Sequence, residues 1–399
     1  MSKAVASQTV TQMLDLFENE SSCFFASPTG ALITKGIRTK VSCEGKIDHW
    51  EELPARVSRI LQEAKNVANE NPIVLGALPF DRYHPIHLFV PNEIVRSAIV
   101  PSSSDMKRQQ HQSAAYTITP VPSAQQFIAC VDSALKLLHD SRLTKVVLSR
   151  TLQLRTKYTI NVKEMIANLA RRNSDGYTFA ITIPQPEAGA RTLIGASPEL
   201  LVSRFGNQIT VNPLAGSIAR SDDPAEDKRR ADELFSSYKN RREHAIVIDA
   251  VKQALHPLCQ QLHVPPAPEL IKTSTMWHLS TVMKGVLADA NTTSLELAVA
   301  LHPTPAVCGT PTDKALEAIR DIEPFDRAYY TGMVGWCDSA GDGEWVVTIR
   351  CADIQDQLVQ LYAGAGIVAE SKPMEELAET SAKFQTMLAA MGLVECEAL

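Results

Sequence analysis

The sequence is short of several features that would assign it to a specialised class of protein. Its eight cysteines are scattered and form no C-x-x-C pair or Cys/His cluster. This argues against a disulfide framework or a zinc site and favours free thiols in a reducing compartment. No stretch approaches the roughly 18 consecutive apolar residues of a membrane-spanning helix. The N-terminus lacks the basic start and apolar core of a signal peptide, so we expect a cytoplasmic protein.

The chain also lacks an excess of positive charge. Its formal net charge is −6 and its pI is near 6.0, which argues against a nucleic-acid partner or a basic membrane-binding surface. With 399 residues, 45% of them hydrophobic and 21% charged, the chain resembles ordinary globular proteins and can bury a sizeable core. That length allows two domains or one large unit.

A glycine pair near the C-terminus has the spacing of a nucleotide-binding loop. The segment "LYAGAGIVAE" holds Gly364, Gly366 and Ala369 in the pattern G-x-G-x-x-A. That fingerprint requires a strand, a helix that opens on the last small residue, and a second parallel strand. Here the apolar run continues and Pro373 delays any helix, so no complete βαβ unit can follow. The dinucleotide interpretation fails, and the role of the glycines depends on the rest of the chain.

Composition divides the chain at one place. Residues 100–123 are rich in Ser, Gln and Pro, which is typical of a long surface connection. Strand-like pieces precede it. After it, Ser123 and Gln126 form a predicted capping box in front of a helix with apolar residues at helical spacing.

The second part of the chain predicts many strands and few helices. We expect a long charged helix from about Asp223 to His263 and a strand over 269–287. Residues 328–368 predict a meander of three strands, and an amphipathic helix over about 374–391 follows. Clustered antiparallel strands with interspersed helices favour an α+β fold over a doubly wound sheet.

The last predicted helix carries a stripe of charge. Glu376, Glu379 and Lys383 fall at i, i+3 and i+7 and share one face. From spacing alone, a solvated face with one ion pair is the simpler interpretation. The stripe nevertheless follows directly from the glycine loop, where exposed amides attract anions.

Four further residues have both an ordinary and a functional interpretation. Lys145 lies in an apolar strand, where an edge position is usual, but burial would favour the neutral amine, a usable base. Glu199 suits a cap at a strand start, Glu243 the solvated face of a charged helix, and His278 a satisfied core position. None of these signals is specific alone.

Nine segments between about residues 123 and 392 form a pattern when taken together. They are "LTKVVLSR", "GASPELLV", "PLAGS", "RREHAIVID", "TMWHLST", "LHPTPAVCG", "EPFDRAYYTGMVGWCDSAGDGEWVVTIRCA", "AGAGIV" and "ELAETSAKF". In this order they resemble the chorismate-utilising enzymes, and among them most nearly the isochorismate synthases of catechol-siderophore pathways. The stretch "VGWCDSAGDGEWVVTIRCA" is the most specific, whereas the first hundred residues match less sharply.

The resemblance implies one large α+β unit, in which two mixed β-sheets pack together with helices outside and the active site in a deep cleft. Residues 1–100 would form the N-terminal part of this single unit of residues 1–399, and residues 124–392 its catalytic chorismate-binding region. It also implies a Mg²⁺-dependent isomerase that converts chorismate to isochorismate. Water adds at C2 of the ring while the C4 hydroxyl leaves, as the first step towards 2,3-dihydroxybenzoate for a siderophore.

The resemblance also implies residue roles. Lys145 matches the base and Glu199 the acid that this reaction needs. Glu243 and Glu379 match the Mg²⁺ carboxylates, with Glu376 as a further acidic position; carboxylate oxygens suit this hard cation. The implied substrate-binding residues are His278, Arg350, Gly364, Gly366, Lys383, Tyr330, Gly216, Ser217 and Ala306.

Within that set, Arg350 and the amides around Gly364 and Gly366 match a clamp for the enolpyruvyl carboxylate, which suits the bidentate fork of arginine. Tyr330 matches a tyrosine that some relatives replace with phenylalanine. The glycine pair would therefore face a carboxylate and not a pyrophosphate.

Two positions separate the relatives. Ammonia-using relatives usually carry Gln where this chain has Lys145, and aminodeoxychorismate synthases carry Lys where it has Ala215. We therefore expect water as the nucleophile, no glutaminase subunit and a monomer. A menaquinone-pathway isochorismate synthase, a salicylate synthase and an inactive carboxylate-binding homologue remain as alternatives. The joint presence of base and acid favours an enzyme over the last of these.

Overall fold

The structure is a computed structural model that describes residues 10–18, 22–41, 50–68, 71–98, 116–185 and 189–393. None of the helices in these ranges combines the length and apolar character needed to cross a bilayer.

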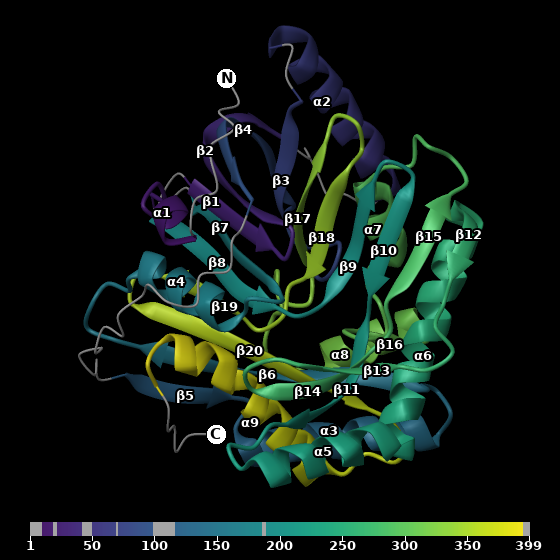
Figure 1. Cartoon of the computed structure of the whole chain (residues 1–399). Helices are drawn as coiled ribbons and strands as arrows, with labels where there is room; N and C mark the ends of the chain where they lie inside the picture. The colour runs from purple at the N-terminus through teal and green to yellow at the C-terminus, as the bar shows by residue number, and fades with distance from the viewer. Residues whose placement is uncertain are drawn as a thin grey trace.

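Within the described residues, seventeen strands form one continuous antiparallel ribbon that curls on itself (Figure 1). In spatial order they are β12 (Cys259–His263), β15 (Met283–Leu287), β10 (Gln208–Asn212), β9 (Leu200–Phe205), β18 (Gly343–Val347), β17 (Met333–Asp338), β3 (Ile73–Leu78), β4 (His87–Ser97), β2 (Gly30–Lys40), β1 (Ser22–Ser27), β7 (Tyr177–Gln185), β8 (Gly189–Ser197), β19 (Cys351–Gln355), β20 (Leu358–Ile367) and β6 (Lys145–Arg155), with β5 (Thr117–Val121) and β16 (Gly309–Thr310) both paired to β6. The α+β class is as predicted, but every pairing in the described residues is antiparallel, so the expected mixed sheets are wrong in that detail.

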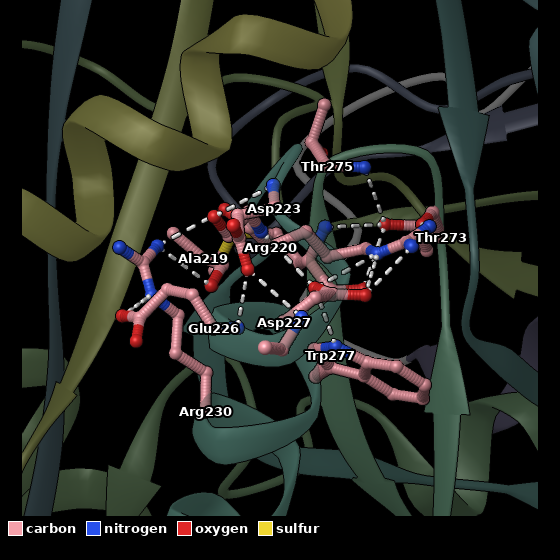
Figure 2. Close-up of polar contacts among 12 residues, drawn as sticks. Ala219, Arg220, Asp223, Glu226, Asp227, Arg230, Thr273, Thr275 and Trp277 are labelled. Atoms are coloured by element: carbon pink, nitrogen blue, oxygen red, sulfur yellow. Dashed lines mark hydrogen bonds and ion pairs between the residues drawn. The ribbon is translucent and has the colours of Figure 1, made fainter.

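A second, three-stranded sheet consists of β11 (Leu214–Ala219), β14 (Met276–Ser280) and β13 (Glu269–Lys272). Hydrogen bonds connect one end of this sheet to helix α5 (Pro224–Ser236), as Figure 2 shows. The Arg220 guanidinium donates to Asp227 at 2.8 Å and to the Thr273 carbonyl at 3.3 Å, and the Trp277 indole N–H donates to Asp227 at 2.9 Å. This network fixes the sheet that carries three of the predicted substrate-binding residues, Gly216, Ser217 and His278.

Helices cover the outside of the ribbon. They are α1 (Val10–Leu14), α2 (Leu53–Ala68), α3 (Ala124–His139), α4 (Val162–Arg172), α5 (Pro224–Ser236), α6 (Tyr238–Leu255), α7 (Ser294–Leu301), α8 (Thr312–Ile322) and α9 (Pro373–Ala390), with short 3-10 turns at Trp50–Glu52 and His256–Leu258. An inner core of sheet residues, among them Phe25, Phe179 and Trp336, lies between the two sides of the curled ribbon. Three further apolar clusters lie between the ribbon and the helices. Helices therefore lie outside and sheet faces sheet inside, as expected.

Several predicted boundaries need correction. The predicted helix from Asp223 to His263 is two helices, because Ser237 is extended and caps α6 through the N–H of Asn240, and its last residues form β12. The predicted strand over 269–287 is three strands, and the three-strand meander is four. In contrast, the capping box of Ser123 and Gln126 and the last helix are confirmed.

Residues 100–123 were predicted to be a surface connection. The prediction is wrong for the last part of this segment, because β5 pairs there with β6. Residues 99–115 lie outside the described part. The N-terminal part is woven into the ribbon. Strand β3 pairs with β17, and β1 pairs with β7. Residues before and after this region therefore share one sheet.

Candidate active site

A cavity opens between the three-stranded sheet and the strands β6 and β20. Together with the space that is open to solvent at its mouth, its empty volume is about 640 Å³. Of the predicted site residues, it is lined by Glu199, Gly216, Ser217, Glu243, His278, Ala306, Tyr330, Arg350, Gly364, Gly366, Glu379 and Lys383. The prediction thus collected residues from distant segments that the fold does bring together. The predicted Lys145 and Glu376 are not part of the lining and lie behind it.

Lys145, at the start of β6, is completely buried. The alternative of an exposed edge lysine is therefore wrong. Its Nζ lies 2.9 Å from Glu243 Oε1, an ion pair that lacks hydrogen-bond alignment. The pair fits because position 366 on β20 has no side chain: a Cβ there would lie 2.0 Å from Glu243 Oε1 and 2.9 Å from Lys145 Cε. Gly366 thus makes room for the expected base and its carboxylate partner.

Glu199 lies at the start of β9 and is buried, with 3% of its surface exposed. Burial raises the pKa of its carboxyl to about 7, although the Leu214 N–H and the cations Lys145, Lys383 and Arg350 act to lower it. The Leu214 N–H donates to Glu199 Oε1 at 3.4 Å. A carboxyl of this kind is partly protonated near neutral pH and can donate a proton.

Two acidic residues on α9 are paired with lysines. Glu379 accepts from Lys383 at 2.6 Å and from the Ser217 hydroxyl at 2.9 Å. Burial would raise the pKa of Glu379, but Lys383 and Lys239 outweigh it and lower the pKa. Glu376 is fully buried and pairs with Lys239. Burial and the nearby Glu379 raise the Glu376 pKa to about 7, against the effect of Lys239.

These carboxylates bear on the expected metal. Among the described residues, no group of three His, Cys, Asp or Glu side chains is arranged to hold a metal ion, since Glu243, Glu376 and Glu379 each face a lysine. Their chemistry is nevertheless that of a Mg²⁺ site, because they offer buried carboxylate oxygens and Glu376 Oε2 is buried without a hydrogen-bond partner. The donor set fits a hard divalent cation.

The opposite side of the cavity can bind an anion. Arg350 is buried, its Nη2 lies 3.3 Å from His278 Nε2, and its Nη1 has no hydrogen-bond partner in the described residues. Burial, Arg350 and Lys383 together lower the His278 pKa well below its usual range, so this imidazole is neutral. Arg350 also has φ +49°, a left-handed conformation that costs a non-glycine residue roughly 1–2 kcal/mol. Such strain often marks residues held in place for function.

Two stacked tyrosines form another part of the wall. The rings of Tyr330 and Tyr362 lie 4.8 Å apart at 11°, and both line the cavity. A Cβ at position 364 would lie 2.8 Å from the Tyr330 hydroxyl and 2.6 Å from Ser149 Oγ. Sequence analysis missed Tyr362, although it lies two residues before the predicted Gly364 on the same strand face. The period of two along a strand would have identified it.

The comparisons with known proteins agree with this geometry. The model of the family described as chorismate binding enzyme matches residues 87–392. The chain belongs to the chorismate-binding enzyme family. Within this family it is 52% identical over 381 residues to isochorismate synthase DhbC of Bacillus subtilis, which covers 95% of this chain and 96% of that one. It is 41% identical to the vibriobactin-specific isochorismate synthase of Vibrio cholerae, with 96% and 94% covered.

A solved chorismate-binding enzyme has the same fold. The crystal structure of a protein described as a putative 2,3-dihydroxybenzoate-specific isochorismate synthase, DhbC from Bacillus anthracis, superposes with a TM-score of 0.90 at 51% identity. The match covers 96% of this chain and 99% of that one. The predicted family and fold are therefore confirmed.

Proposed function

We propose that this chorismate-binding enzyme converts chorismate to isochorismate, as the first step towards 2,3-dihydroxybenzoate for a catechol siderophore. The observation that carries the proposal is a buried carboxyl with a pKa of about 7, Glu199, in a cavity that is also lined by Glu243, the ion-pair partner of Lys145. Identity of 52% to an isochorismate synthase over nearly the whole chain supports it.

The reaction needs one proton removed and one donated. Water forms a bond to C2 of the ring and loses a proton, while the C4 oxygen takes a proton and leaves as water. Glu199, protonated, would donate to the leaving oxygen. Lys145 would accept the proton of the incoming water, for which it must be the neutral amine and not the ammonium ion paired with Glu243. Each such role typically contributes about 10²–10⁴-fold in rate.

Positively charged side chains would bind the two carboxylates of the substrate. Arg350 would hold the enolpyruvyl carboxylate, because its unpartnered Nη1 and its planar fork suit a bidentate contact. The backbone around Gly364 and Gly366 would complete this clamp. Neutral His278 would lie beside the ring carboxylate, with Lys383 next to Glu379.

Glu243 and Glu379, with Glu376 beside them, would hold Mg²⁺. When bound, the ion would supply positive charge for the ring carboxylate of the substrate. We expect excess EDTA to abolish turnover and added Mg²⁺ to restore it. Calorimetry should show that Glu379→Ala loses Mg²⁺ binding, whereas Lys252→Ala on the exposed face of α6 binds normally. Full turnover in excess EDTA would defeat this assignment.

One experiment separates the candidate reactions. The protein is incubated with chorismate and Mg²⁺, and isochorismate, salicylate and pyruvate are resolved by chromatography. Isochorismate alone is expected. Salicylate with pyruvate would point to a salicylate synthase, and no product at all would point to a carboxylate-binding homologue.

Water should be the nucleophile without any partner subunit, because Lys145 stands where ammonia-using relatives have glutamine and Ala215 stands where aminodeoxychorismate synthases have lysine. Product that appears only when ammonium is supplied would contradict this. Assignment to a siderophore pathway and not to menaquinone rests on the relatives that are specific for 2,3-dihydroxybenzoate and vibriobactin. We expect the enzyme to act in the cytoplasm as a monomer.

A further inference from the structure

A histidine that sequence analysis did not single out lies between the cavity and the core. His244 follows Glu243 on α6 and is 3% exposed. Its Nδ1 lies 3.1 Å from the carbonyl oxygen of Ala215, and its Nε2 lies 2.7 Å from Thr281 Oγ1. Both ring nitrogens thus contact the three-stranded sheet, Nδ1 at β11 and Nε2 at the residue that follows the neighbouring strand β14.

The direction of the two hydrogen bonds follows from chemistry. Nδ1 faces a carbonyl oxygen, which has no hydrogen to donate, whereas Nε2 faces a hydroxyl, which can donate or accept. A carbonyl can only accept, so the N–H is on Nδ1 and donates to Ala215. In the neutral imidazole Nε2 then accepts from the Thr281 hydroxyl, which favours this tautomer.

The Ala215 carbonyl lies at an irregularity of β11. Leu214 pairs with Ser280 and Ser217 with His278 of β14, but the register shifts between Leu214 and Ser217. Ala215 and Gly216 therefore fall outside the regular ladder, and Gly216 has φ +79°. Irregularities of this kind re-aim side chains next to active sites. The bond from His244 replaces a missing strand partner at this point.

The segment 214–217 touches two functional groups at its ends. At one end, the Leu214 N–H donates to Glu199. At the other, the Ser217 hydroxyl donates to Glu379. A shift of the segment would therefore move the expected acid relative to an expected metal carboxylate.

We propose that His244 is a positioning residue that fixes the segment 214–217, and with it the spacing between Glu199 and Glu379, through its bond to the Ala215 carbonyl. The inference deepens the proposed function. The expected effect of His244 on kcat rests on that proposed function. His244 acts through the segment and does not touch the substrate cavity, whose lining does not include it.

A pair of nearly isosteric variants tests the bond separately from packing. In His244→Asn the side-chain amide can still donate from nearly the position of Nδ1, whereas His244→Leu fills the space without a donor. We expect His244→Leu to lower kcat by about 10²-fold with little change in KM, the loss typical of a misplacement of about 1 Å. His244→Asn should recover most of this loss. Thr281→Val, which removes only the hydroxyl that favours this tautomer, should fall between wild type and His244→Leu.

Equal kcat in the Asn and Leu variants, or losses confined to Tm, would overturn the inference and leave a packing role. Failure of the proposed function is distinguishable, because it would appear as wild-type protein that makes no isochorismate. In that case ¹⁵N NMR of the imidazole decides, because an Nδ1 without a proton contradicts the inference. A crystal structure of His244→Leu with an unmoved segment 214–217 would contradict it as well.

Discussion

At the scale of the residue, burial explains what Glu199 can do. Its carboxyl lies away from water among three cations, and desolvation outweighs their combined attraction. The sequence assigned the role of acid to Glu199 only through family resemblance, because a glutamate at a strand start is ordinarily exposed. Lys145 was expected as a free base and is instead ion-paired with Glu243, a contact between distant segments that no local pattern encodes.

Acid and base should be separable by mutation. We expect Lys145→Ala and Glu199→Gln each to lower kcat at least about 10²-fold, since each removes one proton-transfer group. Mg²⁺ and chorismate should still bind, because Glu379 and Arg350 remain. Steady-state kinetics and calorimetry measure the two effects. A Lys145→Ala enzyme with near wild-type turnover would show that this lysine is only structural.

The pKa of Glu199 predicts a pH dependence. The acid must be protonated, and this form predominates below a pKa of about 7 and is lost above it. The value of kcat/KM should therefore fall as pH rises through about 7 in a pH–rate profile. The residual activity of Glu199→Gln should lack this limb. A limb that persists in the variant would belong to another group.

At the scale of the element, strand β20 places Gly364 and Gly366 directly beside side chains from other segments of the chain. Its register with β6 places Gly364 opposite Ser149 and Gly366 opposite Val147. The sequence predicted a strand here and excluded a nucleotide loop correctly. It could not predict that the glycines leave room for Ser149, Tyr330 and Glu243, because those contacts depend on tertiary structure. The sequence also failed to predict the break between β18 and β19. Arg350 lies in this break in a left-handed backbone conformation, which no local pattern predicts.

Gly366→Ala should therefore disable the site without unfolding the protein. Its Cβ would lie 2.0 Å from Glu243 Oε1, so the carboxylate must leave Lys145. We expect kcat to fall at least about 10-fold, while circular dichroism at 25 °C is unchanged. Gly206→Ala is the control: it has open space but φ +62°, so Tm should fall and kcat should not. The opposite pattern would contradict this use of Gly366.

At the scale of the whole molecule, one ribbon unites segments that composition separates. The notable Ser- and Gln-rich stretch predicted a connection between two parts, and the pairings β1–β7 and β3–β17 cross it. Pairing partners over such separations leave no signal in a single sequence. Only the family resemblance predicted a single unit.

Deletion of residues 1–100 should consequently prevent folding of the remainder. Strands β7 and β17 would each lose a partner, and the inner core would lose Phe25, Leu75 and Phe89. We expect an insoluble product, or a soluble one without a cooperative thermal transition by calorimetry. A soluble fragment with a sharp transition would show that residues 124–392 form an independent domain.

The pairing of Ile73 with Asp338 has a consequence for synthesis. Until the ribosome has translated β17, the edge of β3 that pairs with β17 has no partner strand. An unpaired apolar strand edge can associate with other chains. Pairings between strands that are far apart in the sequence also slow folding, because the entropy of closing the long loop is lost before the favourable contacts form. The yield of native protein in cells should therefore depend on temperature and on chaperones more than its equilibrium stability would suggest.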